Sequence, residues 1–223
     1  PTPVVDEVVR LGRLTETEGT LNPDVQAELW RMYDKAKVGT AKLLGADPAE
    51  ISLTRHVTEG MNIVATGMDW SESDEVIISD EEHPGGSLPW MNLARRRGIT
   101  VRLLRMSYSL DNLLSDLDKL INPRTRIVSL SHVSTKSGFL IPAKEITEFV
   151  HKKGVPIVFD GAHAAGLVPI DVKKIGCDFY SGCGHKWIMA PQGTGFLYVN
   201  KERLDDLKIT WLGAATAVNW DLE

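Results

Sequence analysis

Short strand-like segments alternate with helix-like segments from residue 51 to residue 199, and this alternation limits the possible folds more than any other feature of the chain. The predicted strands cover residues 51–54, 75–79, 100–104, 126–130, 155–159, 177–180 and 195–199. The predicted helices between them cover residues 58–67, 88–97, 110–120 and 143–153, and a short helical piece follows His163. Such alternation is typical of a layered α/β domain, so we predict a mostly parallel sheet of seven strands.

Two helical segments precede the alternating region. Valines and leucines recur at helical spacing in residues 4–14, whereas residues 15–22 are polar and contain a glycine, which predicts a loop. Pro23 suits the first turn of a second helix, which an apolar stripe continues to about Leu44. Gly45 and Pro48 predict its end.

Composition excludes several function classes. The 223 residues are 43% hydrophobic and 25% charged, enough for one full domain core. The net charge is −5 and the longest basic run is residues 95–97, so we expect no binding to nucleic acid or to an anionic membrane. No apolar run approaches the roughly 20 residues of a membrane span. Two cysteines are too few for a disulfide framework, and we expect a cytoplasmic protein.

Polar and ionisable residues follow five of the seven predicted strands. They lie in the segments 55–60, 81–86, 131–135, 160–163 and 181–195. Ligands of α/β sheets bind at the carboxyl ends of the strands. The sequence therefore predicts one site, built at a single edge of the sheet from segments that are far apart in the chain.

The glycine-rich segment 181–195 contains one amine, Lys186, between His185 and Trp187. Its four glycines let the backbone come close to a ligand. A lysine in these surroundings can be partly desolvated, which lowers the pKa of its amine and frees its lone pair. Such an amine forms a Schiff base with an aldehyde, either a carbonyl substrate or pyridoxal phosphate (PLP). On this segment alone, a glycine-rich hairpin with a surface lysine is an equally good interpretation.

Two further segments, one with a threonine and one with a histidine, could bind such a cofactor. Thr58 can cap the helix that follows it, where a phosphate would be attracted; a plain N-cap is the alternative. His83 precedes a predicted turn at residues 84–86, so its imidazole can stack on a flat ring or move a proton. A solvated loop histidine is the alternative.

The segment around Asp160 could hold the ring of the cofactor. Asp160 ends an apolar strand, and a carboxylate at the mouth of a buried strand needs a cationic partner, such as a protonated pyridinium nitrogen. A helix N-cap is the alternative. His163 can hydrogen-bond the phenolic oxygen of the same ring, or it can be a satisfied surface histidine. His185 can supply a donor to the phosphate while Lys186 reaches the aldehyde carbon.

Together, these segments resemble the class V aminotransferase family of fold-type-I PLP enzymes. This family includes cysteine desulfurases, selenocysteine lyases, cysteine C–S lyases and isopenicillin N epimerase-like proteins. The resemblance spans about residues 22–212 and rests on the segments 57–62, 82–84, 131–134, 158–163, 184–187 and 191–195. It implies a three-layer α/β/α PLP-transferase fold of the aspartate aminotransferase type.

The resemblance also implies roles for the candidate residues. Lys186 would form the Schiff base with PLP and later move the α-proton, Asp160 would pair with the pyridine nitrogen, and His83 would stack on the ring. His163 stands where the family has Gln or His near the phenolic oxygen.

The phosphate and the rest of the cofactor have implied partners too. Thr58 and the amides around it, including that of Val57, would hold the phosphate together with His185. Thr135 would also contact the cofactor, although many relatives have Asn at its position. Many relatives likewise have Ser or Asn where Cys183 stands, and a thiol is a poorer donor to phosphate.

The implied function is that of a homodimeric enzyme that removes the α-proton of an amino-acid substrate through a lysine Schiff base and an α-carbanion. Elimination, desulfuration, epimerisation and amino transfer remain open as outcomes. The sequences His-Lys-Trp and Asp-Gly-Ala-His favour the isopenicillin N epimerase-like or the cysteine desulfurase and C–S lyase branch. The alternative is a truncated, catalytically inactive relative that serves as a binding or scaffold subunit.

The resemblance divides the chain into three parts. Residues 1–22 form an N-terminal helix and loop, residues 23–213 form the PLP-binding large domain, and residues 214–223 start the connection to a C-terminal small domain that we expect to be absent. In relatives that domain carries the arginine that binds the substrate carboxylate and, in desulfurases, the persulfide-forming cysteine. Cys177 and Cys183 do not match that cysteine.

Overall fold

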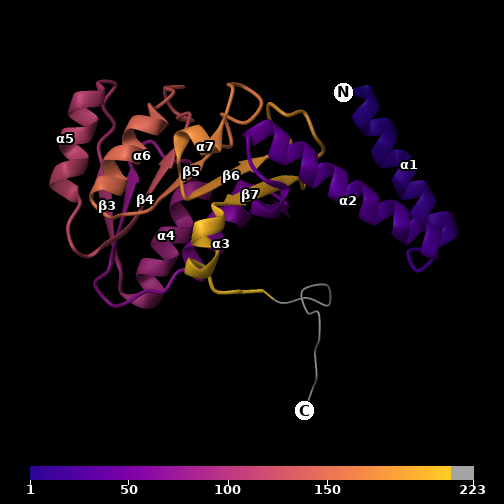
Figure 1. The fold of residues 1–223 in the computed structure, drawn as a ribbon, viewed down its shortest axis with the longest axis horizontal. Helices are drawn as coiled ribbons and strands as arrows, with labels where there is room; N and C mark the ends of the chain where they lie inside the picture. The colour runs from indigo at the N-terminus through magenta and orange to yellow at the C-terminus, as the bar shows by residue number, and fades with distance from the viewer. Residues whose placement is uncertain (212–223) are drawn as a thin grey trace, which may run out of the picture.

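Residues 1–211, which a computed structural model describes, form one seven-stranded sheet covered by helices (Figure 1). The strands are β1 (Ile51–Thr54), β2 (Glu75–Ser79), β3 (Thr100–Leu104), β4 (Thr125–Ser131), β5 (Ile157–Asp160), β6 (Phe179–Cys183) and β7 (Gly195–Val199). The helices are α1 (Thr2–Glu18), α2 (Pro23–Leu44), α3 (Val57–Gly67), α4 (Pro84–Arg97), α5 (Leu110–Leu120), α6 (Ala143–Lys152) and α7 (Val172–Ile175). Two short 3-10 helices, η1 (Pro48–Glu50) and η2 (Lys201–Asp206), complete the set.

The strands lie in the order β1-β7-β6-β5-β4-β2-β3. The pairs from β6 through to β3 are parallel, whereas β7 is antiparallel to both β6 and β1. Because β7 alone reverses, β1 runs in the same direction as the central strands, and its carboxyl end lies at the same edge of the sheet. The prediction of a mostly parallel sheet of seven strands is confirmed.

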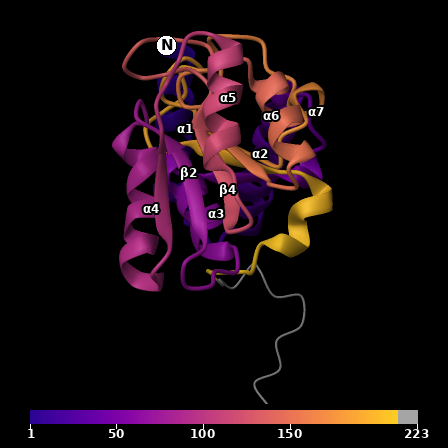
Figure 2. The same ribbon diagram turned by 90° about the vertical axis from the view of Figure 1, so that its left-hand side faces the viewer.

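Alternate strand residues feed two cores, one on each face of the sheet. Ile77 packs in a cluster with buried residues of α2, α5, α6 and α7. Its neighbours Val76 and Ile78 pack in the other cluster, with α3 and α4. Figure 2 shows α4 and α5 on opposite sides of the strands. Because both faces are covered, β2 is buried along its whole length, as is typical of a central parallel strand.

The end of α1 and the start of α4 differ from the prediction. The expected loop at residues 15–22 is wrong in its first half, because α1 continues to Glu18. The hydroxyls of Thr15 and Thr17 bond the carbonyls of Leu11 and Arg13 one turn earlier, which keeps these polar residues compatible with a helix. The expected turn at residues 84–86 is also wrong, because it is the first turn of α4, where a proline fits well.

Prediction also failed around β5 and β6. No helix follows His163 directly; residues 162–167 form turns, and α7 begins only at Val172. β6 begins at Phe179 rather than Cys177 and continues to Cys183. The one glycine of this strand, Gly182, stays in the ladder through its pairing with Phe196 of β7.

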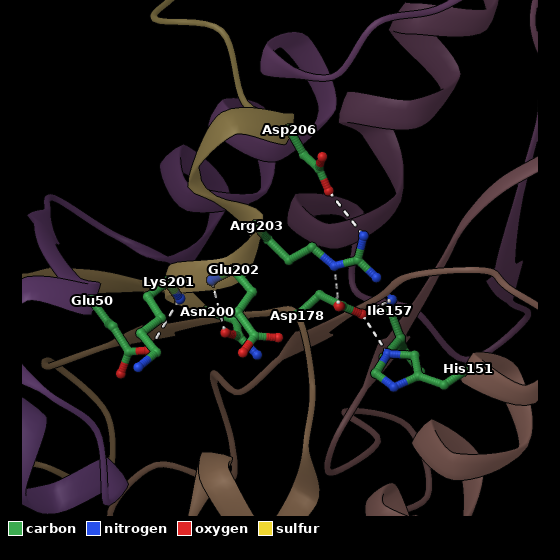
Figure 3. A network of polar contacts seen from close by, with 9 residues as sticks. All are labelled: Glu50, His151, Ile157, Asp178, Asn200, Lys201, Glu202, Arg203 and Asp206. Atoms are coloured by element: carbon green, nitrogen blue, oxygen red, sulfur yellow. Dashed lines mark hydrogen bonds and ion pairs between the residues drawn. The ribbon is translucent and has the colours of Figure 1, made fainter.

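A polar network closes the sheet at the amino ends of β5 and β6 (Figure 3). The Asp178 carboxylate is buried and accepts hydrogen bonds from His151 Nε2 at 2.7 Å, from the Ile157 backbone at 2.7 Å and from Arg203 Nε at 2.8 Å. Burial opposes its charge, but these donors hold the pKa of Asp178 below its usual value. Asp178 therefore ties α6, β5 and η2 together.

Helices that could cross a membrane are absent among residues 1–211. The predicted connection at residues 214–223 lies outside the described residues.

Candidate functional site

The candidate residues gather at the carboxyl edge of the sheet. Asp160 is the last residue of β5, and Ser131, the last residue of β4, pairs with it in the ladder. Lys186 lies in the loop after β6, and His83 follows β2. Val57 follows β1, which has the same direction as these strands. The prediction that separate segments meet at one edge is confirmed.

The Lys186 amine lies against a histidine. Its Nζ is 3.0 Å from His163 Nε2, which is also 3.3 Å from Thr135 Oγ1. Lys186 and His163 are both half-buried. Burial lowers the pKa of His163, and the nearby charges of Lys186 and His83 lower it further. A neutral imidazole beside an amine can accept its proton or share it, which is the arrangement that acid–base chemistry requires.

Asp160 presents a buried oxygen that needs a donor. Its side chain is only 3% exposed, and Oδ1 accepts the Ala162 amide at 2.9 Å. Oδ2 has no hydrogen-bond partner among residues 1–211. Burial raises the pKa of Asp160, while the Ala162 amide and the Lys186 charge oppose this. A cationic N–H group would satisfy Oδ2, so the site fits a protonated ring nitrogen.

His83 is fixed as the N-cap of α4. Its Nδ1 accepts the Gly85 amide at 3.0 Å, and its ring is otherwise exposed. A Cβ on Gly85 would lie 2.4 Å from Thr58 Oγ1 and 3.1 Å from His83 Nδ1, so Thr58 and His83 flank the same glycine. An exposed ring held at its Nδ1 can stack on a flat ligand.

Thr58 does not cap α3, so that prediction is wrong. The N-cap is His56, whose Nδ1 accepts the Glu59 amide at 3.1 Å, because α3 begins one residue earlier than expected. Glu59 turns away to bind Arg55, with an N–O distance of 3.0 Å, and this pairing lowers the pKa of Glu59. The negative charge beside the helix start is thereby compensated.

Two other predicted residues also lie at this edge. Val57 is buried at the start of α3, and its carbonyl accepts the Ser181 hydroxyl at 3.0 Å. His185 is half-buried, and its Nδ1 is a buried atom without a hydrogen-bond partner among residues 1–211. Cys183 is a buried thiol whose Sγ lies 3.7 Å from the Ala162 carbonyl oxygen, and burial raises its pKa.

Sequence reasoning missed the supports beneath the site. Tyr180 lies under Gly161, and its hydroxyl is 2.8 Å from His132 Nδ1. Burial lowers the pKa of His132 to about 4, so the imidazole is neutral near pH 7. Glu82 is buried beside Asp160. Glu82 and His132 lie within the predicted segments 81–86 and 131–135, and Tyr180 directly precedes 181–195, which was the available signal. Their burial was not visible in the sequence.

Comparisons with known proteins point to one family. The family model described as "Aminotransferase class-V" matches residues 3–222. An isopenicillin N epimerase from Streptomyces clavuligerus is 36% identical over 207 residues, covering 90% of this chain and 48% of its own. A probable cysteine desulfurase from Halalkalibacterium halodurans is 34% identical over 180 residues, covering 79% of this chain and 44% of its own.

Solved structures agree in fold. The cystine C–S lyase C-DES, in complex with its product cysteine persulfide, superposes with a TM-score of 0.91 at 29% identity, covering 96% of this chain and 57% of that one. A lysine-to-alanine mutant of C-DES carries glycine covalently linked to its PLP cofactor. The chain spans about half the length of the curated relatives it matches. The three-layer PLP-transferase fold is thus confirmed, and the chain belongs to the class V aminotransferase family.

Proposed function

We propose that this protein is a PLP-dependent enzyme that acts on an amino acid at the carboxyl edge of its sheet. One observation carries the proposal: a half-buried amine, Lys186, with His163 at 3.0 Å, shares this edge with the buried and unpartnered Oδ2 of Asp160. An amine for an aldehyde and an acid for a ring nitrogen are the two groups that PLP requires of a protein.

The bound cofactor would supply an electron sink for the charge left when an amino acid loses its α-proton. Lys186 is positioned to hold the aldehyde carbon and then to move that proton. Asp160 would pair with the protonated ring nitrogen, and His83 would cover the face of the ring. His163 lies beside the amine and Thr135 lies beside His163. Both would orient the amine and would be available to the phenolic oxygen.

The phosphate would lie near the start of α3. Thr58 and the amide of Val57 belong to its first turn, where backbone N–H groups and the helix dipole favour an anion. Nδ1 of His185, which has no hydrogen-bond partner within residues 1–211, offers a further contact.

We favour a reaction of the isopenicillin N epimerase or of the cysteine desulfurase and C–S lyase type. The named relatives and the C-DES structures support both. The large domain would comprise residues 23–213, with residues 1–22 before it and residues 214–223 starting a connection towards a small domain. The enzyme would work in the cytoplasm, where buried free thiols such as Cys177 and Cys183 stay reduced.

We further propose that it is a homodimer. None of the α1 residues is buried by the part of the chain that the structure describes. A groove of about 680 Å³ runs between α1, α2 and the loop after Lys186, and its lining is largely apolar. Val8 lines this groove and is exposed, and an apolar surface of this kind suits a second copy of the chain.

The test is to add PLP to the purified protein, reduce the mixture with borohydride and locate the modified residue by mass spectrometry. We expect a yellow protein modified at Lys186, and a colourless one for Lys186→Ala. Lys174→Ala, at an exposed lysine paired with Asp171, is the matched control and should stay yellow. A panel of amino acids, followed for sulfide, pyruvate, keto acids and inversion, would then assign the reaction. A wild-type protein that does not bind PLP would instead favour the alternative of an inactive scaffold subunit.

A further inference from the structure

A second buried carboxylate lies behind the proposed ring-nitrogen acid. Glu82 is only 8% exposed. Its Oε1 accepts the Ser79 hydroxyl at 2.5 Å and the Ser131 amide at 2.9 Å, and its Oε2 accepts the Ser131 hydroxyl at 2.6 Å. Because these donors come from β2 and β4, the carboxylate fastens the ends of two neighbouring strands together.

The same carboxylate adjoins Asp160. Ser131 pairs with Asp160 in the ladder between β4 and β5, so Glu82 holds the residue beside it. A Cβ built on Gly86 would lie 3.0 Å from Asp160 Oδ2 and 3.4 Å from Glu82 Oε2, so both oxygens face this one glycine. Burial raises the pKa of Glu82, the serine donors oppose this, and the charge of Asp160 adds to the rise.

We propose that Glu82 is a positioning residue, which fixes the end of β4 against Asp160 and adds negative potential where the cofactor's ring nitrogen carries its proton. This inference rests on the proposed function, because it requires PLP at the site. Two buried carboxylates repel each other until a cation lies between or beside them, and a protonated ring nitrogen is such a cation. Glu82 thus strengthens an ion pair to which it does not itself bond.

The test compares two cofactors. PLP and its analogue with CH in place of the ring nitrogen are titrated into the wild type and into Glu82→Gln, which keeps the shape and removes the charge. We expect the variant to bind PLP about tenfold more weakly, because it lacks one unit of negative charge beside Asp160, and to bind the analogue with unchanged affinity. Glu81→Gln is the matched control, since Glu81 also accepts three hydrogen bonds, all from hydroxyls, those of Ser134, Ser137 and Tyr108. It should leave the ratio of the two affinities unchanged.

An equal loss of affinity for both cofactors in Glu82→Gln would overturn the inference and leave the proposed function standing. A wild type that binds neither cofactor would overturn both. If Glu82→Gln does not fold, Ser79→Ala removes one donor that keeps Glu82 ionised, and it should weaken binding of PLP alone, by about threefold. An unchanged ratio of affinities in Ser79→Ala would then count against Glu82.

Discussion

Glycines set how closely the side chains of the site approach the backbone. A Cβ on Gly161 would lie 2.1 Å from the Tyr180 ring, closer than real atoms approach. The tyrosine is fully buried and bound to His132, so it has no room to move aside. Asp160 directly precedes this glycine, so the placement of Asp160 depends on residue 161 having no side chain.

Gly161→Ala should lower the free energy of unfolding by about 3 kcal/mol, because the methyl group overpacks a rigid aromatic ring. Gly39→Ala is the matched control: Gly39 lies on the exposed surface of α2 with open space around it. There the same change should stabilise the protein by about 0.5–1 kcal/mol through helix propensity. Urea unfolding followed by circular dichroism measures both, and equal effects would refute this account of Gly161.

Asp160→Asn should weaken PLP binding by about 10- to 100-fold, since a neutral amide cannot pair with a protonated ring nitrogen. The cofactor-free variant should be at least as stable as the wild type near pH 7. Burial raises the pKa of Asp160 in the folded state, so its ionisation opposes folding at any pH above the unfolded value. Titration of PLP and thermal unfolding without PLP separate the two effects, and a large loss of stability would contradict the prediction.

At the scale of elements, the bounds of β1, β2, β3, β7 and α5 could be predicted, but the starts of α3 and α4 and the ends of α1 and β6 could not. Apolar runs identify β2 and β7 with their observed bounds, because burial on both faces demands such runs. The start of α4 was missed because its cap is a histidine rather than one of the usual capping residues.

The site was predictable to a similar degree. The rule that ligands bind at strand ends placed Lys186, Asp160 and His83 together. It placed Glu82 in a site segment but could not identify its role, because its burial depends on the pairing of β2 with β4 and on hydrogen bonds from both strands. Spacing along the chain carries no information about such a contact.

The Asp178 network makes a prediction for the elements it joins. Asp178→Asn should lower the free energy of unfolding by about 2–4 kcal/mol, because Arg203 and His151 lose a buried charged partner. In the wild type, the pKa of Asp178 is depressed in the folded state. Its contribution is therefore complete above the unfolded pKa of about 4 and is lost as the pH falls further.

Chemical denaturation of wild type and variant between about pH 3 and pH 7 tests this prediction. The difference between their free energies of unfolding should shrink towards the acidic end. Asp206→Asn is the control, because Asp206 binds the same arginine at the exposed surface. It should cost less than about 1 kcal/mol. A stability difference that stays constant down to pH 3, about one unit below the unfolded pKa, would contradict the role given to the Asp178 charge.

At the scale of the whole molecule, the exposed valines of α1 predict self-association. Val8 is 50% exposed and lines the groove beside the Lys186 loop. Val8→Asp should raise the dissociation constant of a dimer by about tenfold or more, because a charge would be buried at the interface. Leu204→Asp is the control at an equally exposed leucine of η2. Light scattering across a concentration series gives the masses, and a wild type that remains monomeric would contradict the homodimer.

The short strand β5 joins the two polar regions, since the Ile157 amide at one end bonds Asp178 and Asp160 at the other end belongs to the proposed site. Three residue steps separate them, about 10 Å along the strand. Thermal stability and the proposed reaction therefore depend on opposite ends of one strand. The ion network could therefore be redesigned to raise stability without the loss of activity that stabilising changes often cause.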